Sequence, residues 1–298
     1  MSRRVVACAF GAALLSLGVG CKNFRAVGDG DNPFALRLEW NPGGFLATAN
    51  GPGHDLGLVT YPADAIGITP TSYAWTAATE SSAESYQVEY ALAPDMRQAI
   101  MNQVDGVARG WGCVQTGAGI QCNNVPPQCT ARLDGCILDT EAGSSAAALV
   151  DLGARFVALQ QQMNLDARQI AEVVVAFVQH IQYDVPQNTF QINSPAVSVA
   201  DNRGDCDSKS LLGYVLLRAV GVQSMIFESE AHVHAMLGIA VPGSGEGWTY
   251  DGVTWLATEM TAENFVIGFM DPSMREPNDW AAMPLADVGP AGYGKPKK

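Results

Sequence analysis

The sequence predicts an α+β fold in which helices pack on an antiparallel sheet, preceded by a β-rich, disulfide-bearing N-terminal region. Early in the chain, apolar and polar residues alternate with the period of two that is typical of half-buried strands. Between residues 144 and 221, apolar residues recur at helical spacing. After residue 221 short apolar runs return, and the pair Asp251-Gly252 predicts a hairpin between two of them.

The N-terminal residues read as an export signal. Arg3 and Arg4 precede an apolar run that is too short for a confident transmembrane helix, and small residues precede Cys21. This arrangement resembles a bacterial lipobox, in which Cys21 is lipidated, although Leu17 stands four residues before the cysteine where the usual pattern has three. Plain secretion and a retained anchor are the alternatives. We expect an exported, lipid-anchored protein, periplasmic or on the cell surface, and Lys22 favours the outer membrane if the cell has one.

The charge balance limits the partners. The formal net charge is -13, and the basic cluster downstream of the signal is the terminal "GKPKK". Nucleic acid is therefore not expected as a partner, because phosphate binding needs clustered lysine and arginine. We expect the membrane to be contacted only through the lipid anchor.

The pattern divides the chain into five parts. The signal peptide (1–20) and a linker (21–33) precede the β-rich region (34–140), a helix-rich catalytic domain (141–285) and a flexible tail (286–298). In the β-rich region, alternation predicts strands within 34–62 and around Tyr86, Val88 and Tyr90. In the next part, Ser144 or Ser145 and then Asn164 are expected to cap two helices, the second ending before Pro186.

Cysteine spacing separates one thiol from the rest. Four cysteines crowd into one loop-like segment at gaps wider than the C-x2-C pairs of zinc sites, which favours two disulfides of open pairing. They are Cys113, Cys122, Cys129 and Cys136. Cys206 is then the odd thiol of an exported chain. It is flanked by Asp205 and Asp207, which disfavours a buried apolar filler.

The stretch "RGDCDSKSLL" predicts a helix start. Asp205 suits the N-cap, and Gly221 suits the C-terminal stop of the helix that follows. Cys206 would lie in the first turn, where the helix dipole favours the thiolate. The flanking aspartates oppose that effect, so reactivity requires a nearby base.

Two histidines and one acid follow in predicted strands. His232 and His234 share the face that is turned away from the core, and Glu259 ends the second strand of the predicted hairpin. The histidine pair is also a possible metal site, although no third ligand stands out. His54 and His180 are expected to be ordinary loop, packing or surface residues.

Helix-borne cysteine, strand-borne histidine and strand-end acid, in that order, resemble the transglutaminase-like superfamily, which shares the papain-like cysteine-peptidase core. The resemblance covers about residues 165–265 and rests on "FVQHIQY", "RGDCDSKSLLGYVLLRAVGV", "HAMLGIAV" and "YDGVTWLATEMT". It implies a papain-like fold with Cys206 as nucleophile, His234 as general base and acid, and Glu259 as the orienting acid. The family usually has aspartate in the third place, and His232 is the competing base.

The expected function is thiol-dependent hydrolysis or acyl transfer on amide bonds of a protein or peptide, without a cofactor. The Cys206 backbone amide is a candidate oxyanion donor. Gln179 and Gln182 are candidates for a second donor, although we expect both to be ordinary glutamines on a helix surface. The alternatives are an inactive binding or scaffold lipoprotein with the same fold, and a true protein-glutamine gamma-glutamyltransferase.

Overall fold

The computed structural model describes residues 53–78, 83–116 and 119–285. The predicted signal, Cys21, the linker, the first part of the predicted 34–62 strands and the C-terminal tail lie outside these residues.

The first sheet has three strands in the order β1-β3-β2. These are β1 (His54–Tyr61), β2 (Thr71–Ala78) and β3 (Ala83–Leu92), with β3 parallel to β1 and antiparallel to β2. Tyr86, Val88 and Tyr90 are buried on alternate positions of β3, which confirms the strand that their spacing predicts. His54 starts β1 rather than lying in a loop, and its ring stacks on Tyr86.

Helices dominate the next part of the chain, including one within the region expected to be β-rich. They are α2 (Pro94–Gly110), α3 (Leu133–Ser145) and α4 (Val150–Met163), with short turns at η2 (Pro127–Cys129) and η3 (Ala146–Leu149). A small hairpin, β4 (Cys113–Thr116) and β5 (Gly119–Cys122), follows α2.

The predicted N-caps of α4 and of the helix that follows it are wrong. Ser144 and Ser145 lie in the last turn of α3 and donate their hydroxyls back to the Glu141 carbonyl, as serine does inside helices. Asn164 ends α4 in a left-handed conformation. Asp166 caps α5 (Ala167–His180) instead, through a capping box with Gln169.

Two short strands and two helices lead into the second sheet. They are β6 (Gln182–Tyr183), α6 (Pro195–Asp201), β7 (Arg203–Gly204) and α7 (Cys206–Ala219). The start of α7 after Asp205 and its stop before Gly221, which has a positive φ of 77°, agree with the sequence pattern.

The second sheet is antiparallel throughout, in the order β10-β11-β9-β8-β12. Its strands are β8 (Ser224–Ser229), β9 (His234–Ile239), β10 (Gly247–Tyr250), β11 (Val253–Thr258) and β12 (Ala281–Met283), with η4 (Pro272–Met274) and η5 (Pro277–Asp279) before β12. Asp251 and Gly252 join β10 to β11 with positive φ at both positions, the geometry of a type I′ hairpin.

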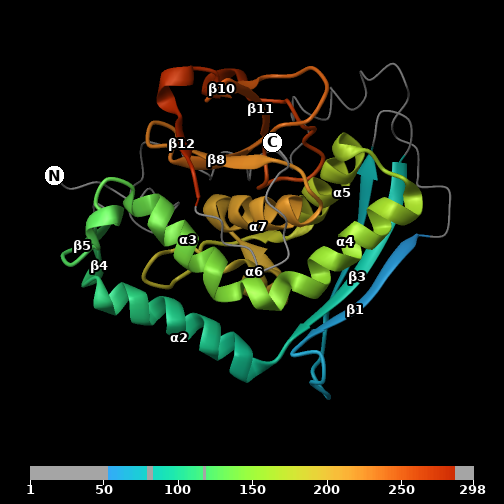
Figure 1. The fold of residues 1–298 in the computed structure, drawn as a ribbon, viewed down its shortest axis with the longest axis horizontal. Helices are drawn as coiled ribbons and strands as arrows, with labels where there is room; N and C mark the ends of the chain where they lie inside the picture. The colour runs from blue at the N-terminus through green and yellow to red at the C-terminus, as the bar shows by residue number, and fades with distance from the viewer. Residues whose placement is uncertain (1–52, 79–82, 117–118, 286–298) are drawn as a thin grey trace, which may run out of the picture.

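Helix α7 runs through the middle of the molecule (Figure 1), in contact with α3, α4, α5, α6, β8 and β9. One core cluster joins it to the first sheet, where Trp75 packs against Phe156 of α4 and Phe177 of α5. Each buried aromatic of this kind contributes about 1.5–3 kcal/mol. The boundary expected after residue 140 falls inside α3, and the main core cluster contains residues from both sides of it.

Both faces of the second sheet are covered, contrary to the expectation that β9 has one open face. Ala235, Leu237 and Ile239 pack into the main core, while Met236 joins a second apolar cluster with Phe227 and Trp248. The alternation placed the residues on the right faces, but both faces are buried because Met270 and Trp280, from the segment between β11 and β12, pack on the outer one.

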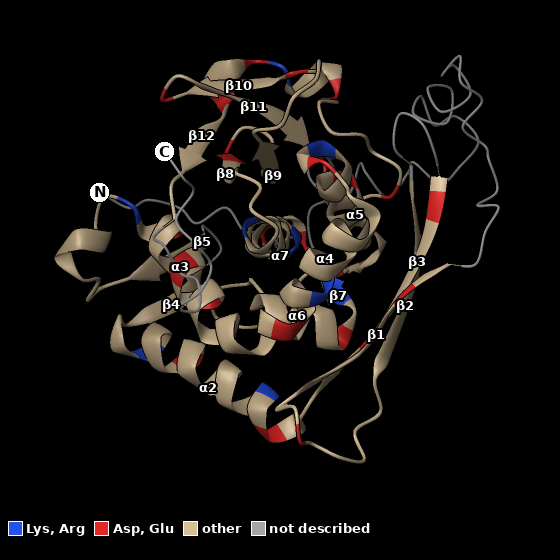
Figure 2. Cartoon of the chain, turned by 45° about the vertical axis from the view of Figure 1, so that its right-hand side comes forward, with Lys and Arg blue, Asp and Glu red and all other residues tan. Residues whose placement is uncertain are grey.

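Within the described residues, the helical run Leu133–Met163 is long and apolar enough to cross a membrane by length and composition. Its apolar side chains Leu149, Leu152 and Phe156 lie in the main core. Aspartate and glutamate positions are spread over the helices and strands that surround α7 rather than gathered on one element (Figure 2).

Candidate active site

The first turn of α7 holds Cys206 in a fixed position. The Asp205 Oδ1 accepts hydrogen bonds from the backbone N–H (3.0 Å) and the hydroxyl (2.6 Å) of Ser208, which caps the helix. Gly204 is needed before the cap, because a Cβ there would lie 3.0 Å from the Cβ of Ser208. Cys206 is thereby the first helical residue, as predicted, and its side chain is fully buried.

The other cysteines of the described residues are paired. Cys113 bonds to Cys122 across the β4-β5 hairpin, and Cys129 bonds to Cys136 at the start of α3. Among the described residues, Cys206 is the cysteine that forms no disulfide. The prediction of two disulfides and one odd thiol is confirmed, and the pairing that the sequence left open is sequential.

The environment of the Cys206 sulfur favours the thiol. Burial raises the pKa of Cys206 well above its ordinary value, and the charges of Asp207 and Asp205 raise it further. The thiol donates to the Asp207 Oδ2 at 3.8 Å, and the sulfur accepts a smaller compensating hydrogen bond from the backbone of Ala235. The helix start does not make this cysteine a thiolate by itself.

His234 and Glu259 form a buried pair beside it. The Nε2 of His234, the first residue of β9, lies 2.8 Å from the Oε2 of Glu259, the residue after β11. Their side chains are 1% and 2% exposed, so water does not screen the interaction. Because Ala235 contacts the Cys206 sulfur, the structure brings His234 and Glu259 to the same end of α7 as Cys206.

Glu259 is held as a carboxylate. Its Oε1 accepts hydrogen bonds from the backbone N–H (2.7 Å) and the hydroxyl (2.5 Å) of Thr261. Burial raises the pKa of Glu259, but the nearby His234 and the hydrogen bonds from His234 and Thr261 outweigh it and leave the pKa below its ordinary value. Glutamate reaches the imidazole although the superfamily pattern has the shorter aspartate.

His232 lies outside β9 and faces a different carboxylate. Its Nε2 is 3.3 Å from the Oδ2 of Asp279, and its ring packs 5.8 Å from the ring of Trp280. Val233, between the two histidines, has a φ of 50°, which is rare for a β-branched residue and turns the chain as it enters the strand. Each histidine therefore engages its own acid rather than a shared metal position.

One group of side chains in the described residues comes close enough to hold a metal ion. The ligand atoms of Asp205, Cys206 and Asp207 lie within 4.8 Å of one another and are buried. Ser208 donates to one oxygen of Asp205 and the Cys206 thiol donates to Asp207, and the raised pKa of Cys206 and of Asp207 favours their protonated forms. In this state the three side chains suit a protonated thiol rather than a bound cation.

Gln179 is buried rather than on a helix surface, and its amide is engaged away from Cys206. The Gln179 Nε2 donates to the backbone carbonyls of Glu259 (2.7 Å) and Phe265 (2.9 Å), and Gln182 is exposed on β6. Gln179 instead fixes the chain that carries Glu259. His180 pairs with the exposed Glu263 at the surface, as a residue without a site role does.

Lys209 is a buried residue that the sequence analysis missed. It is 0% exposed, and its Nζ donates to the backbone carbonyls of Gln179 (3.1 Å) and Ile181 (2.5 Å) at the end of α5. Burial lowers the pKa of Lys209 to about 7, although Glu259 and Glu263 act in the other direction. The available signal was its spacing: Lys209 shares a helix face with Leu212 and Leu216, which are buried.

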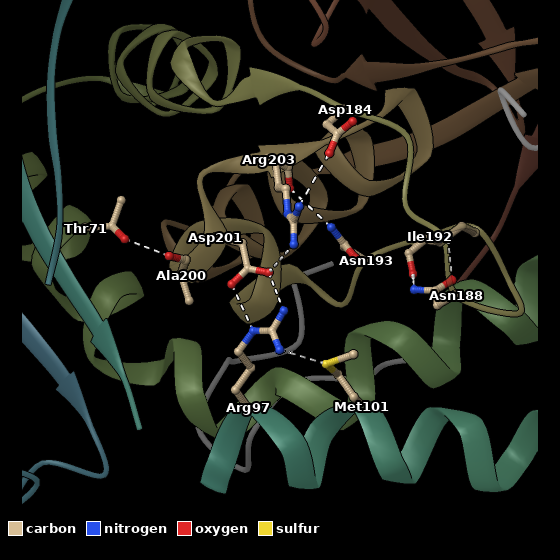
Figure 3. Close-up of polar contacts among 10 residues, drawn as sticks. All are labelled: Thr71, Arg97, Met101, Asp184, Asn188, Ile192, Asn193, Ala200, Asp201 and Arg203. Carbon is tan, nitrogen blue, oxygen red and sulfur yellow. Dashed lines mark hydrogen bonds and ion pairs between the residues drawn. The ribbon is translucent and has the colours of Figure 1, made fainter. Parts of the chain in front are cut away.

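An ion-pair network fixes the chain that enters α7 (Figure 3). Arg97 of α2 binds both carboxylate oxygens of Asp201, at 2.9 Å from Nε and 2.5 Å from Nη2. Arg203 contacts Asp201 at 3.2 Å and Asp184 at 3.6 Å. Two-point binding by arginine is geometrically specific, so this network sets the position of β7 and, through Gly204, of Cys206.

An acidic cavity of about 580 Å³ lies beside the candidate active site. Asp134, Glu228, Glu230 and Asp279 line it together with Trp280, whose ring lies 6.4 Å from that of His234. Burial raises the pKa of Glu228 to about 8, and the charge of Asp134 adds to this. An anion that entered here would meet several carboxyl groups.

Comparison of the chain with models of protein families, with curated protein sequences and with solved structures finds no match. A functional assignment therefore has to come from the side chains of the site.

Proposed function

We propose that the protein is an exported, thiol-dependent hydrolase or acyl transferase that acts on amide bonds through Cys206, His234 and Glu259. The observation that carries this proposal is the buried 2.8 Å pair of His234 and Glu259, placed one residue from the contact between Ala235 and the Cys206 sulfur. The residue types on α7, at the start of β9 and after β11 support the proposal, because a thiol, an imidazole and a carboxylate suit nucleophilic catalysis.

The tautomer of His234 follows from its partner. An ionised Glu259 only accepts hydrogen bonds, so the Nε2 of His234 carries the hydrogen and Nδ1 is the basic nitrogen. Nδ1 would take the proton of Cys206 as the sulfur attacks a carbonyl carbon, and Glu259 would stabilise the imidazolium that forms. His234 would then give the proton to the leaving amine, which leaves a thioester on Cys206.

The second half of the reaction regenerates the thiol. Water attacks the thioester in hydrolysis, and an amine attacks it in transfer, with His234 as the base in both cases. The backbone N–H of Cys206, in the first turn of α7, is one proposed donor to the oxyanion. A substrate can reach the sulfur only after neighbouring side chains move, because Cys206 has no exposed surface.

Export and anchoring through Cys21 are part of the proposal. The two disulfides support an oxidising compartment, where such bonds persist. A protein or peptide is the proposed substrate, and the reaction as proposed uses no cofactor.

The binding or scaffold protein remains the second candidate. The fully buried Cys206 and its raised pKa favour it, because both reduce reactivity of the thiol at neutral pH.

Acylation of the thiol separates the two candidates. The full chain is incubated with p-nitrophenyl acetate, and acetylation is quantified on the Cys206 peptide by mass spectrometry. We expect a thioester on Cys206 that forms more slowly in His234→Gln, whereas His180→Gln, which alters a surface histidine paired with Glu263, leaves the rate unchanged. An unreactive Cys206, or equal rates in all three proteins, would favour the scaffold. Ammonia release with amine incorporation into a glutamine peptide would identify transfer.

A further inference from the structure

Tyr183 lies beside the turn that leads to Cys206. Strand β6 pairs in parallel with β7, and the register places Tyr183 opposite Gly204, two residues before Cys206. The backbone N–H of Asp184 donates to the Gly204 carbonyl at 3.2 Å and fixes this register. Arg203, which contacts both Asp184 and Asp201, ties the same two segments together. The position of Tyr183 relative to the site is therefore set by backbone pairing and by an ion-pair network.

The hydroxyl of Tyr183 is buried and has no hydrogen-bond partner among the described residues. The Oδ2 of Asp205, next to Cys206, is a second buried polar atom of the described residues without a partner. Leaving such a group unpaired is unfavourable, so most buried hydroxyls in native proteins are satisfied. The open Tyr183 hydroxyl, on the strand that pairs with the turn before Cys206, indicates that a polar group from a ligand completes it.

The surroundings keep the hydroxyl protonated. Burial raises the pKa of Tyr183 far above its ordinary value, and the charges of Cys206, Asp205, Asp207 and Glu259 add to the rise. The phenol therefore stays neutral and can donate a hydrogen bond.

We propose that Tyr183 is a further catalytic residue, whose hydroxyl donates a hydrogen bond to the carbonyl oxygen of the substrate as Cys206 attacks the carbonyl carbon. The inference rests on the function proposed above. It supplies the second oxyanion donor for which Gln179 is not available, since the Gln179 amide binds two backbone carbonyls.

In this step the sulfur–carbon bond forms, the thiol proton moves to His234, and the electron pair of the C=O bond moves onto oxygen. The Tyr183 hydroxyl and the Cys206 backbone N–H stabilise that charge. The carbonyl then re-forms as the bond to the leaving group breaks, and His234 returns the proton to the leaving group. Tyr183 keeps its own proton throughout.

Two reagents test this role, one whose reaction with Cys206 forms an oxyanion and one whose reaction does not. Acylation by p-nitrophenyl acetate passes through an oxyanion, whereas alkylation by iodoacetamide does not. Both reactions are followed on the Cys206 peptide of the full chain, in wild type and in Tyr183→Phe. We expect acylation to fall by about 10²-fold, the usual size for loss of one oxyanion donor, with alkylation unchanged. Tyr214→Phe is the matched control, since the Tyr214 hydroxyl binds Arg218 farther along α7 and should affect neither reaction.

The outcomes separate the two proposals. A wild-type Cys206 that is alkylated but not acylated would overturn the proposed function, whatever Tyr183 does. If wild type is acylated, two results would overturn the oxyanion role alone. Tyr183→Phe could slow acylation and alkylation equally, or it could slow neither reaction. Replacing Tyr183 with 3-fluorotyrosine provides a second variant that keeps the ring and the hydroxyl. Its more acidic phenol should speed acylation and leave alkylation unchanged, and equal acylation rates in the folded proteins would contradict the role.

Discussion

The imidazole of His234 and the carboxylate of Glu259 lie 2.8 Å apart in the interior of the protein. Neither residue neighbours the other in sequence, and the antiparallel pairing of β9 with β11 brings them together. Thr261 binds the second oxygen of Glu259, so the carboxylate has one orientation available for the histidine. This rigidity is the property that a residue orienting a catalytic base needs.

Replacing Glu259 with glutamine should reverse the tautomer of His234. The two donors of Thr261 would hold the amide oxygen of the glutamine, which turns its NH2 group towards Nε2. Nδ1 would then carry the hydrogen and could not accept the Cys206 proton. We expect acetylation of Cys206 to fall by about 10²-fold or more. Glu263→Gln, which alters a carboxylate paired with His180 at the surface, should have no effect, and a similar loss in both variants would contradict this account.

Lys209 should make the free energy of unfolding rise with pH above about 7. Its pKa of about 7 in the folded protein lies below the 10.5 of an ordinary lysine, so between these values the unfolded chain holds a proton that the folded one has released. The free energy of unfolding of wild type should therefore rise relative to that of Lys209→Met as the pH increases from 7 towards 10.5. Urea unfolding at pH 6 and pH 9 measures this, with the exposed Arg155→Met as control. A difference that does not change with pH would show that Lys209 keeps its proton in the fold.

Glu141 should make the free energy of unfolding fall as the pH rises. Burial raises its pKa to about 8 from an ordinary 4.5, although the Ser194 hydroxyl donates to it at 2.5 Å. Its contribution to stability is full below pH 4.5 and is lost as the pH rises through about 8. Glu141→Gln should thus gain stability relative to wild type across this range, while Glu89→Gln at an exposed site should not. Parallel curves for wild type and Glu141→Gln in thermal unfolding would refute the shift.

The disulfides should stabilise the fold without serving the chemistry. Each closes a short loop, with separations of 9 and 7 residues, so loss of either is expected to cost about 2–3 kcal/mol of unfolding free energy. Peptide mapping of unreduced protein should show sequential bonds, and the Cys113→Ser/Cys122→Ser double variant should still be acylated at Cys206. A mixed disulfide that includes Cys206 would contradict both the pairing and the proposed nucleophile.

Local patterns predicted the start of α7 well. Asp205 is a strong N-cap, and the apolar residues after Cys206 fit one helix, so the outcome depended on residues within a few positions. The hairpin at Asp251-Gly252 was predictable for the same reason, since positive φ at both positions selects these residue types.

Features set by distant contacts were not predictable. Helix α2 buries Ile100, Val104 and Ala108 at four-residue spacing, a weak signal within a region of strands. The sequence alone predicts a solvent-exposed Lys209, because lysine is rarely buried. Its burial depends on the backbone carbonyls at the end of α5, which accept its hydrogen bonds. The outer cluster over β9, and with it the contact of Trp280 with His234, depends on how the segment between β11 and β12 packs on the sheet.

The pH dependence of Cys206 alkylation tests the central claim most directly. Because burial and the flanking aspartates raise the pKa of the Cys206 thiol, rapid reaction near neutral pH requires His234 to take its proton. Iodoacetamide alkylation of the Cys206 peptide is measured from pH 6 to pH 11 in wild type and in His234→Gln. The account predicts that wild type reacts at least about tenfold faster at pH 7 and that the two rates converge at high pH, where the thiolate forms without a base. Equal rates in the two proteins at every pH would contradict it.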